Sequence, residues 1–271
     1  MLMRNVEFKN RELIELVNDL KDDINSIIEN HSEHLLDMLE KKVYKNSPDG
    51  RRADKKESIY KTAPHHDILP ELECIKENSN LYDPCGRDYL EYMINLSENK
   101  ICTYDESEWC GWPNKELFIN LTDLSGSQQL KEYNLKEKAD KITYGWLNGN
   151  SRALFGLYPP NGYIPWHNNG NAPGYNILMH YSWGGEGGFH SYHNGEIIDY
   201  PDKDNEWIAR AGRFESTEGT GMVGDDTVSV SQKDASWHCA DTKCWRLTVS
   251  TIINNKDIWE DVIEEMESVD L

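Results

Sequence analysis

Two histidines and one arginine in the second half of the chain have the types and positions that metal and anion chemistry requires. His167 ends an expected strand at residues 163–167, and His238 lies just before an expected strand at 245–253, which contains Arg246. Neutral imidazole suits Fe, Zn, Cu or Ni, and two histidines from opposite edges of a small barrel leave positions open on the metal. The pair predicts catalysis or substrate binding. The alternative is two ordinary strand-end histidines and a surface arginine.

The strand at 245–253 predicts an anion site beside the metal. Its residues alternate, so Arg246, Thr248 and Ser250 share one face while apolar side chains share the other. An uncompensated guanidinium inside a barrel costs on the order of several kcal/mol. A carboxylate held by the guanidinium, with the Thr248 hydroxyl beside it, is the natural partner. We therefore expect a ligand with a free carboxylate.

A third histidine is expected to face the same cavity. In the strand at 176–182, His180 shares a face with Asn176, Leu178 and Ser182. Its imidazole could contact the ligand's carboxylate without touching the metal. A core histidine satisfied by a neighbouring hydroxyl or carbonyl explains the pattern equally well.

The elements that must position these residues are short strands. After residue 144 the chain consists of aromatic and β-branched runs broken by Gly, Asn and Pro, which is typical of an antiparallel β sandwich or barrel. About eight strands are expected, as in a jelly roll, at residues 152–158, 163–167, 175–183, 188–192, 196–200, 207–211, 228–231 and 245–253. The predicted fold class is α+β with a mainly β core, a double-stranded β-helix of the jelly-roll or cupin-like type.

Helices are expected on both sides of this core in the sequence. Apolar residues recur at helical spacing over residues 12–43, as one long or two consecutive helices, and again at 87–95 and 257–266. The polar stretch at 46–57 reads as a linker. We therefore expect an N-terminal helical segment (1–60), a mixed cap or support region (61–140), the double-stranded β-helix core (141–255) and a C-terminal helix (256–271).

The composition excludes some classes of binding partner but says little about the reaction. The formal net charge of −20 disfavours binding to nucleic acids and to anionic membranes, which leaves a small molecule, a peptide or a protein as the expected substrate. The six cysteines form no CxxC pair and no dense framework, so reduced thiols are expected. Because no long apolar run or signal peptide is evident, we expect a cytoplasmic protein.

At this point a resemblance to a known family becomes specific. The segment at 158–167, the following His180, and His238 with Arg246 and Thr248 downstream resemble the Fe(II)- and 2-oxoglutarate-dependent oxygenases, particularly the aspartyl/asparaginyl β-hydroxylase branch. The resemblance extends over residues 152–253. It implies that His167 and His238 bind Fe(II), that Arg246 pairs with the distal carboxylate of 2-oxoglutarate, and that His180 assists with its other end.

The resemblance also implies an activity, the hydroxylation of a C–H bond in an amino-acid or peptidyl side chain, with 2-oxoglutarate converted to succinate and CO₂. One position departs from the wider family, which has a carboxylate two residues after the first histidine. Here that residue is Asn169, a poor neutral ligand, so either it binds weakly or water takes the place. The β-hydroxylase branch likewise manages without the carboxylate.

Other functions are compatible with the same residues. A vacant third position could accept halide, which would make the protein a halogenase, although hydroxylation ranks well above it. Loss of activity is a further alternative. The competing class is a non-catalytic jelly-roll module that binds a metal or an anion, or that packs as a structural component.

Overall fold

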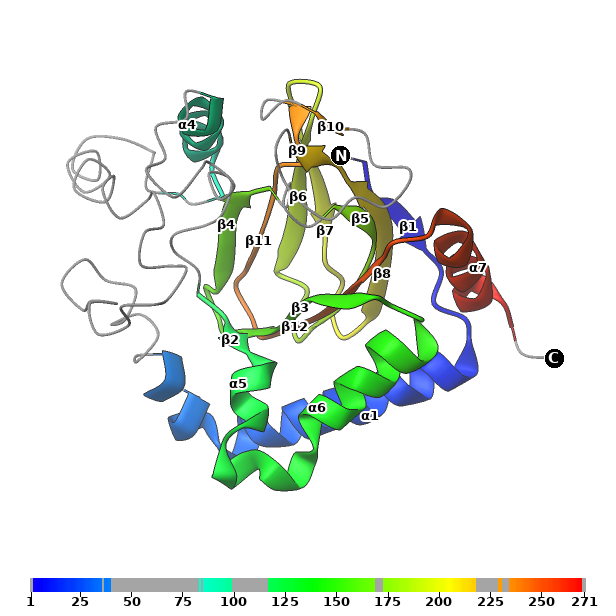
Figure 1. The fold of residues 1–271 in the computed structure, drawn as a ribbon. Coiled ribbons are helices and arrows are strands. Elements are labelled where there is room, and N and C mark those ends of the chain that lie inside the picture. Colours follow the sequence, from blue (N-terminus) through cyan, green and yellow to red (C-terminus); the bar gives the residue numbers. More distant parts are fainter. Residues whose placement is uncertain are drawn as a thin grey trace, which may run out of the picture.

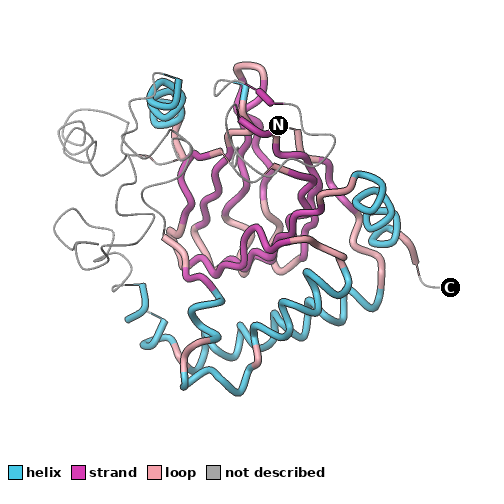
Figure 2. Tube along the Cα trace, viewed as in Figure 1, coloured by secondary structure: helices cyan, strands magenta, loops and turns pink. Residues whose placement is uncertain are grey.

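The computed structural model describes residues 2–35, 37–39, 83, 85–98, 117–168, 173–217, 229–230 and 234–269. Within these residues, two mostly antiparallel sheets face each other and helices pack against their outer sides (Figures 1 and 2). The expected linker at 46–57 and the boundary near residue 60 lie outside the described residues.

The larger sheet has six strands in the order β1-β8-β5-β12-β3-β2. Its bounds are β1 (Arg4–Val6), β8 (Trp207–Phe214), β5 (Gly174–Ser182), β12 (Arg246–Ile253), β3 (Ser151–Tyr158) and β2 (Ile119–Asn120). All neighbouring strands in it are antiparallel. Every residue of β5 and of β12 is buried, because both strands lie inside the sheet and are covered on both faces.

The smaller sheet has four strands in the order β4-β11-β6-β7. Its bounds are β4 (Tyr163–His167), β11 (His238–Thr242), β6 (Gly187–His193) and β7 (Glu196–Pro201). The turn between β6 and β7 is made by Asn194 and Gly195, which both have positive φ angles, as an Asn-Gly hairpin requires. A separate parallel pair joins β9 (Ser216–Thr217) to β10 (Ser229–Val230).

Most of the helices cover the outer face of the larger sheet. They are α1 (Arg11–Asn30), α5 (Leu121–Ser125), a 3₁₀ helix (Gln128–Tyr133), α6 (Leu135–Asp140), a π-helix (Lys141–Trp146) and α7 (Lys256–Glu267). Figure 1 shows α1, α5 and α6 lying along one side of the strands. Helix α1 begins where the Asn10 side chain accepts a hydrogen bond from the Leu13 N–H, and its apolar residues at three- and four-residue spacing enter the core.

The outer face of the smaller sheet is covered by α4 (Arg87–Glu98). Leu90 and Met93 of this helix pack against Trp166 of β4 and Trp237 beside β11. The Trp166 indole N–H donates a 2.8 Å hydrogen bond to the Cys85 carbonyl, which ties the start of the helix to the strand. The histidines of β4 and β11 are therefore backed by a packed apolar layer.

The expected mostly antiparallel β core with accompanying helices is confirmed, and most of its elements fall at the expected residues. The N-terminal pattern gives α1, which ends at Asn30, and further helical residues at 32–35 and 37–39, so the alternative of two consecutive helices holds for the described part. The expected helices at 87–95 and 257–266 correspond to α4 and α7.

The expected strand at 228–231 is present as β10 at residues 229–230, but it pairs with β9 outside the two main sheets. The strand that the sequence analysis missed is β11 of the smaller sheet, which starts at His238. The sequence of β11 is HCADT, and its Asp and Ala have low strand propensity, so pattern alone does not reveal it. In the described part of the chain, no helix is both long enough and apolar enough to cross a membrane.

Candidate functional site

His167 and His238 lie opposite each other at the ends of neighbouring strands. They are paired across β4 and β11, and their ring centroids are 4.2 Å apart. Both side chains are buried, and both rings line a cavity between the two sheets. The structure thus brings together the two histidines that the sequence singled out as metal ligands.

The local backbone fixes the protonation of both rings. His167 Nδ1 donates to the Pro165 carbonyl at 2.8 Å, and His238 Nδ1 donates to the Ser236 carbonyl at 2.7 Å. Burial lowers the pKa of His167 to about 4, and burial together with His167 lowers the pKa of His238 well below its ordinary value. Each ring is therefore neutral near pH 7, with its lone pair on Nε2, which is the form that coordinates a metal.

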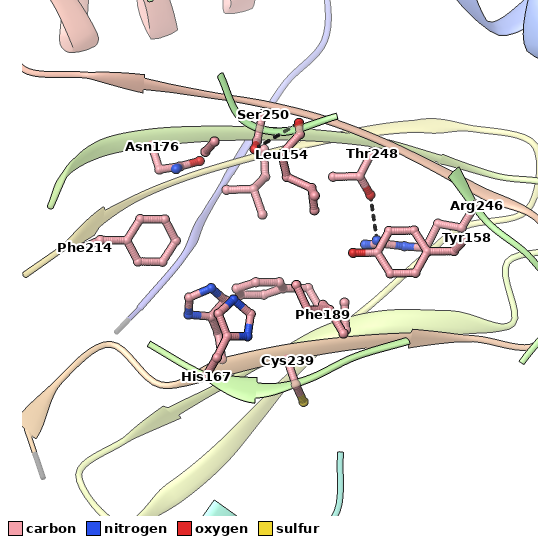
Figure 3. Close-up of a pocket in the computed structure, with 15 residues that line it drawn as sticks. Leu154, Tyr158, His167, Asn176, Phe189, Phe214, Cys239, Arg246, Thr248 and Ser250 are labelled. Carbon is pink, nitrogen blue, oxygen red and sulfur yellow. Dashed lines mark hydrogen bonds between the residues drawn. The ribbon is translucent and has the colours of Figure 1, made fainter. Parts of the chain in front are cut away.

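The cavity between the sheets has a volume of about 60 Å³, which is room for several water-sized groups. Figure 3 shows His167 and Phe214 toward one end and Arg246, Thr248 and Tyr158 at the other. The rest of the lining is mainly apolar and includes Leu154, Ile164, Leu178, Phe189 and Ala240. A polar ligand in this cavity would therefore be held at its two ends.

Arg246 is completely buried and only partly satisfied. Its Nε donates to Asp202 Oδ2 and its Nη1 donates to Thr248 Oγ1, both at 2.7 Å. Its Nη2 is buried and has no hydrogen-bond partner among the described residues. Burial alone would lower the pKa of Arg246, but Asp202 raises it above its ordinary value. The side chain is therefore a fixed cation with a donor left over for an anionic ligand.

His180 shares the inward face of β5, as expected, but it does not line the cavity. It lies between Arg210 and Asp202: its Nε2 accepts from Arg210 Nη1 and is 3.5 Å from Asp202 Oδ1. Burial, with Arg246 and Arg210 nearby, lowers the pKa of His180 well below its ordinary value. In this arrangement His180 supports the arginines.

Asp202 and Arg210 are site residues that the sequence reasoning missed. Arg210 could have been found, because the alternation in β8 places it on the same face as Phe214, which lines the cavity. Asp202 follows β7, and because the chain is rich in acidic residues, the sequence favours an exposed loop position for each of them. Its side chain is buried and 2.7 Å from Arg246 Nε.

Asn176 is a second polar group without a partner. Its side chain is fully buried and lines the cavity, and neither Oδ1 nor Nδ2 has a hydrogen-bond partner among the described residues. Leaving a buried amide unpaired costs roughly 1–3 kcal/mol. The amide is therefore available to a ligand or to a water molecule at the Phe214 end of the cavity (Figure 3).

The remaining candidate positions are less informative. Asn169 lies outside the described residues. His190 is outside the cavity and bonds to Asp199 and Asp241. In the described part of the chain, no group of three or more His, Cys, Asp or Glu side chains is arranged to hold a metal ion. Among the described residues, His167 and His238 are therefore the side chains that could hold a metal at this cavity.

Comparisons with known proteins do not identify the chain. No family model matches the sequence. No curated protein matches it. Among solved structures it resembles a predicted oxalate decarboxylase from Thermotoga maritima, with 20% identity over 38% of this chain and 70% of that one, and a TM-score of 0.21. A likeness at this level carries no argument about fold or activity.

Proposed function

We propose that this protein is an Fe(II)- and 2-oxoglutarate-dependent dioxygenase that hydroxylates a C–H bond of an amino-acid or peptidyl side chain. The observation that carries the proposal is one small cavity with two facing, neutral histidines toward one end and a buried arginine with an unpartnered N–H donor at the other. A keto acid with a distal carboxylate has complementary groups at its two ends.

The strand order supports a double-stranded β-helix as the scaffold. In chain order, β3, β5, β8 and β12 belong to the larger sheet, and β4, β6, β7 and β11 belong to the smaller one. If these eight strands are numbered along the chain, the neighbours in the larger sheet are the first, eighth, third and sixth strands. The neighbours in the smaller sheet are the second, seventh, fourth and fifth strands, and the two orders together are those of a jelly roll. This arrangement puts the second and seventh strands side by side, and these strands carry His167 and His238.

The residues present fit the two groups that the proposal requires. His167 and His238 would hold Fe(II) through Nε2, because their Nδ1 protons are committed to backbone carbonyls. Arg246 and Thr248 would hold the distal carboxylate, with Asp202 fixing the guanidinium through Nε. When bound, the iron and cosubstrate supply the oxidising chemistry. The chain itself supplies orientation and walls of Leu, Ile and Phe that exclude water.

The competing proposal is a non-catalytic module that binds an anion or a metal. It is favoured by one observation, the absence of a three-residue ligand set among the described residues. The two proposals differ in oxygen consumption and in succinate formation. They do not differ in carboxylate binding.

An anaerobic titration followed by exposure to oxygen tests the proposed function. Purified protein with Fe(II) and 2-oxoglutarate should develop a charge-transfer absorption band, and oxygen should then convert 2-oxoglutarate to succinate. If the wild-type protein gives no charge-transfer band and forms no succinate, the enzyme proposal is refuted and the binding module is favoured.

Variants assign the roles of the two ends. Arg246→Ala should weaken 2-oxoglutarate binding while metal affinity stays nearly constant, and His238→Ala should remove both. Arg152→Ala is a matched control, because Arg152 lies on β3 and its side chain faces Asp140 of α6. Equal binding in all these proteins would contradict the assignment.

A further inference from the structure

Arg246 belongs to a buried charge cluster that extends behind the cavity. The cluster consists of Arg246, Asp202, Arg210 and His180, whose side chains are at most 3% exposed. Only Arg246 lines the cavity. Asp202 lies between the two arginines: its Oδ2 accepts from Arg246 Nε at 2.7 Å, and its Oδ1 is 3.9 Å from Arg210 Nη1.

The charges of this cluster do not cancel. Burial lowers the pKa of Arg210 to about 10, so it remains a cation near pH 7, as does Arg246. His180 is neutral, because burial and the two arginines lower its pKa. Two cations thus face one carboxylate, which leaves one net positive charge. Asp241 also acts on Arg246, but from a half-exposed position where it bonds to His190.

The position of Asp202 poses an electrostatic problem for ligand binding. A carboxylate ligand at Arg246 Nη2 would lie near the Asp202 carboxylate, which already neutralises Arg246. Without another cation the pair would be neutral overall and would offer little attraction to an anion in a site where charges interact strongly. Arg210 supplies that cation. It is held by the Pro201 carbonyl, to which its Nη2 donates at 2.7 Å, and by His180.

We propose that Arg210, a positioning residue, makes the Arg246 end of the cavity selective for a singly charged carboxylate by neutralising Asp202. Arg246 then keeps its full positive charge for the ligand. This inference rests on the proposed function for the choice of ligand, but it concerns binding and not turnover.

A charge-balance experiment tests it. Protein loaded with Mn(II) is titrated calorimetrically with 2-oxoglutarate and with 2-oxopentanoate, a keto acid of equal length that lacks the distal carboxylate. In the wild-type protein 2-oxoglutarate should bind more tightly. Arg210→Met removes the cation and should reduce that preference by roughly tenfold or more. Arg210→Lys keeps the charge and should keep most of the preference.

The rescue variant separates charge from structure. Arg210→Met combined with Asp202→Asn restores one net positive charge, and the asparagine carbonyl can still accept from Arg246 Nε. The double variant should therefore recover the preference that the single variant loses. Mn(II) affinity and thermal midpoint should be measured for each protein, so that loss of the fold is detected separately.

The outcomes are distinct. Preserved preference in Arg210→Met, absence of rescue in a folded double variant, or failure of all the proteins to bind either acid would overturn the inference. Wild-type protein that prefers 2-oxoglutarate and follows the expected pattern, but never forms succinate, would support the inference while refuting the proposed function.

Discussion

Thr248 and Arg246 lie two residues apart on the same face of β12, and the Thr248 hydroxyl accepts a 2.7 Å hydrogen bond from Arg246 Nη1. Thr251 is on the same strand and equally buried, but its hydroxyl donates to the Ser151 carbonyl at 3.0 Å. The two threonines are thus a matched pair, one beside the cavity and one remote from it.

Replacement of Thr248 by valine should weaken 2-oxoglutarate binding. It removes an acceptor from a buried cation, which costs about 2 kcal/mol of stability. Thr251→Val removes a bond to a neutral carbonyl and should cost about 1 kcal/mol without changing ligand affinity. Urea denaturation and calorimetry measure both quantities. Equal ligand affinities in the two variants would contradict the role of Thr248.

Replacement of His167 by alanine should abolish tight metal binding, because one imidazole alone holds a divalent metal poorly; we expect a loss of affinity of roughly 100-fold or more. His190→Ala is the control, since this histidine bonds to Asp199 and Asp241 outside the cavity. Competition with a chromophoric chelator for Zn(II) or Fe(II) gives the affinities. A similar loss in both variants would point to a metal site elsewhere.

Asn176→Leu should stabilise the protein. The substitution replaces a buried, unpartnered amide by an apolar group of similar size, and we expect the free energy of unfolding to rise by about 1 kcal/mol. Asn176→Asp should have the opposite effect at pH 7, because it places an uncompensated charge in the same position. Thermal and urea denaturation of the ligand-free proteins test the pair. A destabilised leucine variant would mean that the amide already has a partner.

The burial of His180 predicts a pH dependence of stability. Its folded-state pKa is lowered by burial and by Arg246 and Arg210, while Asp202 faces it at 3.5 Å. Below about pH 6.5 the unfolded chain therefore binds this proton while the folded chain does not, and the free energy of unfolding falls as pH decreases. The contribution approaches about 1.4 kcal/mol per pH unit for one full proton.

His180→Gln should reduce that dependence, because glutamine does not titrate and its carbonyl can still accept from Arg210. A smaller slope should remain, because burial also lowers the pKa values of His167 and His238. Urea denaturation of the wild type and the variant between pH 7.5 and 5.5 gives the two slopes. Identical slopes would show that His180 does not contribute to the dependence.

The sequence by itself determined the features that follow from local backbone geometry. Strict alternation with a period of two placed Arg246 and Thr248 on one inward face, and helical spacing located the helix at the C-terminus. The same rule brought His180 to the inward side of β5. These features need no knowledge of distant residues.

Tertiary structure decided what depends on strand register across the sheets. β11 was recognisable only through its pairing with β4 and β6, which sets His238 opposite His167. Asp202 is 44 residues from Arg246, and whether it is a solvated surface acid or a buried counter-ion depends on where the chain enters β8. Burial makes such ion pairs strong, because charges removed from water interact through a low dielectric and are stabilised only by other groups of the protein.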